Sequence, residues 1–140
     1  MSLTRSTTIR SLLPALAQSR SRHFSSSIQR RLHVFNADQK KLDECLQVKD
    51  KVVLVDFYAD WCGPCKVLSP VLEKITSDPS HTDGTPYDLV TVDTDVEVEL
   101  AQKYKIRSLP TVLAFRDGKY ITHFIGALPE PKIKEFLKQL

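Results

Sequence analysis

The sequence predicts an α/β fold with a central mixed β-sheet flanked by helices. Two apolar runs of buried-strand type, residues 51–59 and 87–93, enclose a segment with helical periodicity. A right-handed helical crossover between them would make these two strands parallel. Further along, Asp117-Gly118 separates two more apolar runs and is typical of a hairpin, whose strands run antiparallel. The predicted order is therefore β-α-β-α-β-α-β-β-α.

The first elements are an edge strand, a helix and a central strand. Residues 32–35 alternate in polarity, which predicts a short edge strand. Asn36 is a suitable N-cap and is followed by Gln39, as in a capping box, so we expect a helix over Ala37–Val48. Lys51–Ala59 is expected to be the central strand, because its apolar run is nearly continuous.

The remaining elements follow from periodicity and turn residues. An apolar stripe predicts a helix that ends near Ser77, and Pro129 and Pro131 are expected to open the last helix. The other expected elements are a loop over 77–86, a strand over 87–93, a short helix over 96–104, a connector over 106–110, and hairpin strands over 111–115 and 120–125.

Length, composition and charge restrict the class of protein. At 140 residues, with 41% hydrophobic and 26% charged residues, the chain is expected to form one globular domain. No apolar run approaches the ~20 residues of a membrane helix, so we expect no membrane association. From Asp38 onward the chain has 14 basic and 17 acidic residues, a net charge of −3, so nucleic-acid binding is not indicated.

Residues 1–31 have the composition of an organellar transit peptide, with six Arg, eight Ser and no acidic residue. Arg22-His23-Phe24 followed by three Ser resembles a mitochondrial processing site, so cleavage is expected between about residues 24 and 32. This predicts import into the mitochondrial matrix and a mature domain over residues 32–140. A secretory signal around Leu12–Ala17 and a disordered tail without a targeting role are the alternatives.

Two cysteines follow the central strand, Cys62 and Cys65, with only Gly63 and Pro64 between them. The spacing allows a small disulfide ring, and the first sulfur lies where a helix begins. Unpaired N–H groups and the helix dipole would stabilise a thiolate there. Such a pair next to a βαβ pattern indicates a redox motif. Half of a zinc site is the alternative, but a closed site needs four ligands, and Cys45 is the one other cysteine.

Asp56 is a carboxylate inside the central apolar run. An unpaired buried carboxylate is costly, so Asp56 is expected either to face solvent at a strand end or to be kept for chemistry. Cys45, within the first predicted helix, is expected to be a small core residue rather than a reactive thiol.

The segment Val55–Lys66 resembles the active-site segment of the thioredoxin family; it reads Val-Asp-Phe-Tyr-Ala-Asp-Trp-Cys-Gly-Pro-Cys-Lys. Further on, Ile106–Thr111 resembles the cis-proline loop of that family. Phe115–Gly118 and Ile125–Ala127 match further family landmarks in the same order. The resemblance covers about residues 32–140 and implies the thioredoxin fold.

Two residues depart from the family pattern. Tyr58 replaces a Trp often found before the motif, which we expect to change packing only. Thr91 occupies a position where many members have a Lys near the buried Asp, so proton transfer is expected to be tuned differently.

The resemblance implies a protein disulfide reductase that works by dithiol exchange. Cys62 would be the attacking thiolate and Cys65 the resolving thiol, and the two would close a redox disulfide. Asp56 would accept and return the Cys65 proton. Gly63-Pro64 favours a reductant, because an isomerase-type domain more often has His in the pair and a glutaredoxin has Pro-Tyr.

The resemblance also implies a surface for the target protein. Pro110 is predicted to follow a cis peptide bond, which would place the backbone of Leu109 across from the cysteines, where an extended target could pair as an added strand. Trp61 is expected to be exposed beside the nucleophile. The expected apolar rim comprises Trp61, Gly63, Pro64, Leu109, Gly126 and Ala127.

The family's electron path implies the partners. No bound cofactor is expected, since electrons would come from NADPH through a thioredoxin reductase and pass to oxidised proteins such as peroxiredoxins. A monomer is expected. Two alternatives stay open: a protein-binding module whose redox state switches binding, and an oxidising or isomerase-type domain of the same fold.

Overall fold

A computed structural model describes residues 31–140 of the chain. The predicted transit peptide and its processing site lie outside the described residues, apart from Arg31. The elements in order are β1 (His33–Val34), α1 (Gln39–Leu46), β2 (Val52–Tyr58), α2 (Gly63–Ser77), the 3₁₀ helix η1 (Pro79–His81), β3 (Tyr87–Asp93), α3 (Val98–Lys103), β4 (Thr111–Arg116), β5 (Lys119–Ile125) and α4 (Glu130–Leu137).

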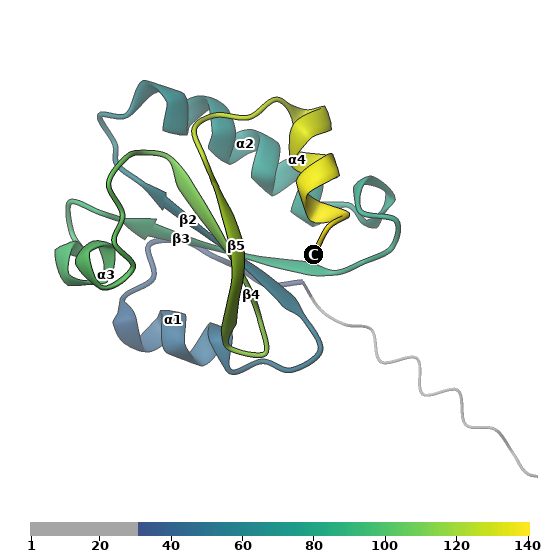
Figure 1. The fold of residues 1–140 in the computed structure, drawn as a ribbon, viewed down its shortest axis with the longest axis horizontal. Helices are drawn as coiled ribbons and strands as arrows, with labels where there is room; N and C mark the ends of the chain where they lie inside the picture. The colour runs from purple at the N-terminus through teal and green to yellow at the C-terminus, as the bar shows by residue number, and fades with distance from the viewer. Residues whose placement is uncertain (1–30) are drawn as a thin grey trace, which may run out of the picture.

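The five strands form one mixed sheet in the order β1-β3-β2-β4-β5. β2 pairs in parallel with β3 and antiparallel with β4, and β4 pairs antiparallel with β5. The predicted crossover and the predicted hairpin are therefore both confirmed. Helices α2 and α4 cover one face of the sheet, while α1 and α3 cover the other (Figure 1).

The central strand β2 supplies side chains to two separate cores. Its odd positions, Val53, Val55 and Phe57, pack with α1 and α3. Leu54 faces the other way and packs with residues of α2 and α4. Because side chains alternate along a strand, Asp56 falls on the same face as Leu54. The carboxyl is thereby placed under α2, the helix that starts at the cysteine pair.

The start of α1 differs from the prediction. Asn36 is not the N-cap: its φ is 54°, in the left-handed region. The backbone N–H of Ala37 instead donates to the carbonyl of Thr91 in β3 at 2.9 Å, which keeps this residue out of the helix. Asp38 is the N-cap, and its carboxylate accepts a hydrogen bond from Lys41 N at 2.7 Å.

Two further boundaries differ from the prediction. The segment predicted as a loop over 77–86 contains η1, which is capped by the Asp78 carboxylate accepting from Ser80 N at 2.8 Å. α3 is shorter than predicted and has no side-chain cap. In the described part of the chain, no helix is both long and apolar enough to cross a membrane.

Candidate active site

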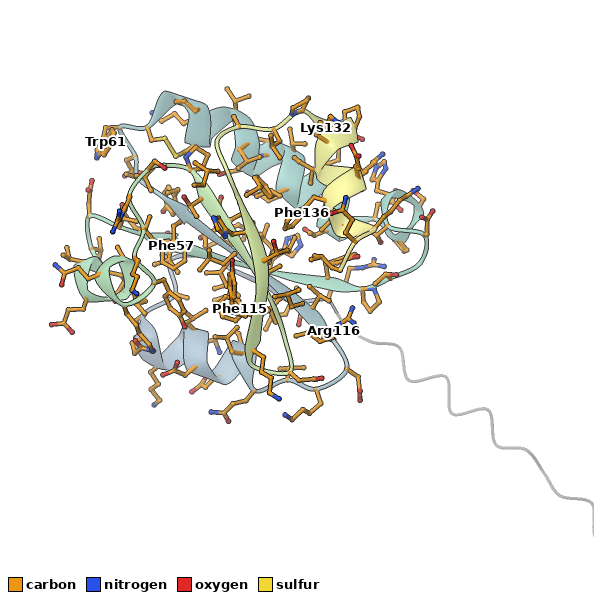
Figure 2. The ribbon with its side chains drawn as sticks, in the orientation of Figure 1. Phe57, Trp61, Phe115, Arg116, Lys132 and Phe136 are labelled. Atoms are coloured by element: carbon orange, nitrogen blue, oxygen red, sulfur yellow. A yellow bond between two sulfur atoms is a disulfide. The ribbon has the colours of Figure 1, made fainter. Side chains whose placement is uncertain are left out.

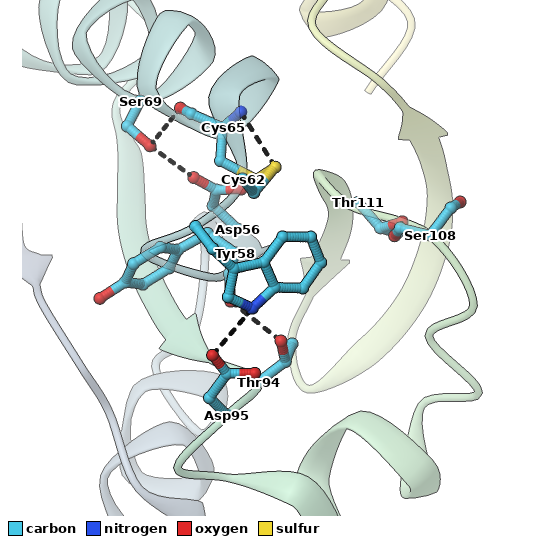
Figure 3. The surroundings of a disulfide bond; sticks show 10 residues. Asp56, Tyr58, Cys62, Cys65, Ser69, Thr94, Asp95, Ser108 and Thr111 are labelled. Atoms are coloured by element: carbon cyan, nitrogen blue, oxygen red, sulfur yellow. Dashed lines mark hydrogen bonds between the residues drawn. A yellow bond between two sulfur atoms is a disulfide. The ribbon is translucent and has the colours of Figure 1, made fainter.

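Cys62 and Cys65 form a disulfide at the point where β2 gives way to α2, and their Cα atoms are 5.3 Å apart. Cys62 is the N-cap of α2, and its Sγ accepts a hydrogen bond from Cys65 N at 3.2 Å (Figure 3). Pro64 lies in the first turn, where its missing N–H costs no helix hydrogen bond. The first sulfur thus lies at the helix N-terminus, as the spacing predicted.

The two cysteines are covered by their neighbours. Cys62 is 4% exposed and Cys65 is 1% exposed, so Cys62 is the slightly more accessible residue. Leu109, from the loop before β4, packs against this pair together with Tyr58. The structure therefore brings together the motif and the loop that the resemblance paired with it.

Asp56 is buried beneath this pair, with only 1% of its surface exposed. Of the two alternatives for Asp56, the solvent-facing strand end is therefore wrong. Ser69 of α2 donates a hydrogen bond from its hydroxyl to Asp56 Oδ2 at 3.2 Å. Among residues 31–140, no hydrogen-bond partner reaches Oδ1. Oδ2 of Asp56 therefore has a hydrogen-bond partner, and Oδ1 is buried without one in this part of the chain.

The environment of Asp56 makes its carboxyl a weaker acid than that of an ordinary aspartate. Burial raises the pKa of Asp56 to about 6, the hydrogen bond from Ser69 opposes that rise, and the charge of Glu73 adds to it. Thr91 is the register partner of Asp56 on β3, so no cation occupies this position on the neighbouring strand. A carboxyl that titrates near neutral pH can take up and release a proton under physiological conditions.

Trp61 projects from the surface beside the disulfide and is 72% exposed, as predicted. Figure 2 shows it at the periphery, in contrast to Phe57 in the interior. Its Nε1 donates to Asp95 Oδ2 at 2.9 Å, which fixes the ring. An open groove of about 250 Å³ runs from this ring to the loop before β4. Its lining residues are Trp61, Thr94, Ala101, Ile106, Arg107, Ser108 and Leu109.

The loop before β4 contains the predicted cis peptide bond between Leu109 and Pro110. Gly126 lies next to it, because its backbone N–H donates to the Pro110 carbonyl at 2.8 Å. The φ of Gly126 is 89°, a conformation that a residue with a side chain rarely adopts. Ala127 follows on the exposed surface and is not part of the groove lining. Five residues of the predicted rim, Trp61, Gly63, Pro64, Leu109 and Gly126, thus lie near the disulfide or the cis bond, and Ala127 lies at the edge.

Two residues that contact the predicted site residues were missed by reasoning from the sequence. Ser69 contacts Asp56 across 13 positions, and Asp95 contacts Trp61 across 34 positions. Neither residue stands in a motif, so only the fold identifies it. Within residues 31–140, no group of three or more His, Cys, Asp or Glu side chains is placed to hold a metal ion.

A chain that holds two cysteines in this way can exchange one disulfide for two thiols, which is the chemistry of a thiol–disulfide oxidoreductase. The family model named Thioredoxin matches residues 33–139, and the chain belongs to the thioredoxin family. It is a protein disulfide reductase of that family.

Three relatives illustrate the similarity. A thioredoxin from Mycoplasmoides gallisepticum is 43% identical over 106 residues, which cover 76% of this chain and 98% of that protein. The crystal structure of Schistosoma mansoni thioredoxin is 31% identical, with a TM-score of 0.67 over 78% of this chain and 95% of that one. Mitochondrial thioredoxin 3 of Saccharomyces cerevisiae, solved in its oxidised form, is 26% identical, with a TM-score of 0.64 over 76% of this chain and 94% of that one.

Proposed function

We propose that this protein reduces disulfides of target proteins in the mitochondrial matrix, with Cys62 as the attacking thiolate. The observation that carries the proposal is the hydrogen bond from Cys65 N to the Cys62 sulfur at the start of α2. In the reduced protein this N–H and the positive end of the helix dipole would stabilise a thiolate at Cys62. Because the thiolate is the nucleophile, Cys62 attacks first.

The reaction then proceeds in two exchanges. Cys62 Sγ forms a bond to one sulfur of the target disulfide, the target S–S bond breaks, and the other target sulfur leaves as a thiolate. Asp56 removes the proton of Cys65, directly or through water, and the Cys65 thiolate attacks Cys62 Sγ. The bond between Cys62 and the target breaks, so the target leaves as a dithiol. Two electrons pass to the target, and the Cys62–Cys65 disulfide remains.

The target binds along the groove between Trp61 and the cis-proline loop. Trp61 and Leu109 line it and offer apolar contact, and Leu109 also packs against the cysteine pair. In the described part of the chain, the backbone N–H and C=O of Leu109 take part in no backbone hydrogen bond, which leaves them available to an extended target strand. Pro110, Gly126 and Ala127 shape the edge of this surface.

The electron supply and the compartment complete the proposal. No resident cofactor is needed, because NADPH would reduce the disulfide through a thioredoxin reductase, and targets would include peroxiredoxins. The protein acts as a monomer. Mitochondrial import is supported by the Arg-rich, acid-free composition of residues 1–31 and by the mitochondrial thioredoxin among the similar structures. Mass spectrometry of the protein from purified mitochondria should find residues 1–24 missing, and an intact N-terminus there would contradict import by cleavage.

A trapping experiment tests the chemistry. With Cys65→Ser, the mixed disulfide at Cys62 cannot be resolved, so target proteins should stay covalently attached until a reductant is added. Cys62→Ser should lose all reduction of insulin disulfides. Cys45→Ser is the matched control, since Cys45 is buried in the α1 core and should be dispensable for turnover. Unchanged insulin reduction in Cys62→Ser would overturn the enzyme mechanism, and partner binding that survives in this variant would favour a binding module.

A further inference from the structure

Ser69 lies one helical turn after Cys65 and contacts both the backbone carbonyl of this resolving cysteine and the buried carboxyl of Asp56. Its Oγ is 3.0 Å from the carbonyl oxygen of Cys65 and 3.2 Å from Asp56 Oδ2 (Figure 3). Ser69 is half-buried, and its hydroxyl has these two hydrogen-bond partners. The first is the ordinary back-bond of a helical serine, and the second links the helix to β2.

One hydroxyl cannot donate to both oxygens at once, because it carries a single hydrogen. When Asp56 is ionised, the hydrogen is better placed toward Oδ2, where the bond is charge-assisted. When Asp56 is protonated on Oδ1, Oδ2 remains an acceptor, so the serine hydrogen can stay on Oδ2 or turn to the Cys65 carbonyl. Oδ2 can therefore keep its hydrogen-bond partner at Ser69 in both protonation states of Asp56.

We propose that Ser69 is a positioning residue for the proton transfer between Cys65 and Asp56: its hydroxyl donates to Oδ2 and so holds the carboxyl with Oδ1 left to accept the proton. The proposal rests on the role of Asp56 as the base in the proposed function. In the resolving step the proton passes from Cys65 Sγ to Asp56, and the Cys65 thiolate supplies the electron pair for the new S–S bond. The proton later leaves for solvent or for the departing thiolate.

Ser69 is the neighbour that orients the Asp56 carboxyl, because the other described groups around Asp56 make no hydrogen bond to this carboxyl. On α2, Glu73 acts at a distance through its negative charge. The register partners of Asp56 are Thr91 on β3 and Val112 on β4, neither of which is charged. Tyr58, two positions along β2, donates its hydroxyl hydrogen to Oδ1 of Asn36 and not to Asp56. Within residues 31–140, the side-chain hydrogen bond that the Asp56 carboxyl receives comes from Ser69.

The expected effect of removing the hydroxyl has a definite sign. The hydrogen bond from Ser69 lowers the pKa of Asp56 against the larger effect of burial, so Ser69→Ala should raise that pKa further. Fewer molecules then carry an ionised Asp56 near neutral pH. If the midpoint moves up by about 1 in pH, the resolving rate at pH 6.5 falls about threefold.

The test is the pH dependence of the resolving step in single-turnover reduction of a disulfide peptide. Trp61 is the one tryptophan of the sequence and lies beside the disulfide, so its fluorescence reports formation of the Cys62–Cys65 bond. Ser69→Ala should shift the rate profile to higher pH, while Ser69→Thr should keep the wild-type profile. Thr fits this helix, because Thr76 of α2 already donates its hydroxyl to the Leu72 carbonyl at 2.8 Å.

A double variant separates a positioning role from a merely structural one. In an Asp56→Asn background, Ser69→Ala should leave the rate profile unchanged, since the group that it positions is gone. A Ser69→Ala profile that superposes on the wild type, or an equal effect in both backgrounds, would overturn the role of Ser69 alone. A wild-type profile in Asp56→Asn would overturn both this role and the assignment of Asp56 as the base. The trapping experiment with Cys65→Ser tests the reductase chemistry independently.

Discussion

Two aspartates are buried in neighbouring strands of the same sheet, and each is only 1% exposed. Asp88, near the start of β3, is fully paired: its carboxylate accepts from Lys51 Nζ at 3.1 and 3.2 Å and from Leu32 N at 2.8 Å. Asp56, near the end of β2, has one hydroxyl at 3.2 Å and an open oxygen. The two carboxylates are thus equally buried, but the hydrogen bonding of Asp88 is complete and that of Asp56 is not.

The difference follows the position of each residue in the fold. Asp88 is in register with Val53, whose side chain packs under α1, whereas Asp56 lies on the opposite face under the start of α2. Ligands and chemistry in α/β sheets gather at the carboxyl ends of the strands, which is the end where Asp56 lies. The paired carboxylate of Asp88 stabilises the fold, whereas Asp56, with one oxygen unpartnered within residues 31–140, is the carboxyl to which we assign proton exchange.

The largest expected effect is at the paired aspartate. Lys51→Met should destabilise the protein by about 3–5 kcal/mol, because it leaves the Asp88 charge buried without its cation. Urea unfolding of the oxidised protein measures this loss. Lys49→Met is the matched control, since Lys49 is exposed two positions away and should change stability little. A loss below about 1 kcal/mol would mean that Asp88 is no better paired than a surface carboxylate.

The opposite sign is expected at Asp56. The unfolded chain holds this carboxyl near its ordinary pKa of 3.8, whereas the folded state raises the pKa to about 6. The folded state therefore binds the proton more tightly, and stability is lost as the pH rises from about 4 to about 6. Asp56→Asn lacks this loss and should be more stable than the wild type by roughly 3 kcal/mol at pH 7.5.

Urea unfolding of the oxidised wild type and Asp56→Asn at pH 4 and at pH 7.5 measures this difference. The advantage of the variant should largely disappear at pH 4, where the wild-type carboxyl is mostly protonated in the folded state. A variant that is less stable than the wild type at pH 7.5 would show that Asp56 is satisfied after all.

The smallest effect sharpens the comparison further. Asp88→Asn should cost about 2 kcal/mol, because charge-assisted hydrogen bonds to Lys51 and Leu32 become neutral ones. Its insulin reduction, corrected for the folded fraction, should equal that of the wild type across the pH range. Asp56→Asn should slow the same reaction, so a slow Asp88→Asn variant would remove the functional distinction between the two aspartates.

Much of the fold could be predicted because β2 and β3 are continuous apolar runs and the hairpin is marked by Asp117-Gly118. The start of α1 could not, since Asn36 and Asp38 are both good caps and a bond from Ala37 to another strand decides between them. The hydrogen bond from Ala37 to Thr91 joins residues far apart in the sequence, so it cannot be predicted from the residues around the helix start.

Some features of the site could likewise be predicted from the sequence, and others depend on the fold. The cysteine pair, its place at a helix start and the cis-proline loop follow from motifs, whereas the burial of Asp56 depends on α2 folding over it. Ser69 and Asp95 act through contacts between residues far apart in the sequence, so no local pattern marks either of them.

The central claim is that burial, only partly offset by the hydrogen bond from Ser69, makes Asp56 the proton-exchanging carboxyl of the site. A ¹³C NMR titration of carboxyl groups in the oxidised protein tests this directly, with the Asp56 signal identified by its absence from Asp56→Asn. The account predicts a titration midpoint near pH 6, the value to which burial raises the pKa of Asp56. A midpoint near pH 4, where an ordinary aspartate titrates, would contradict it.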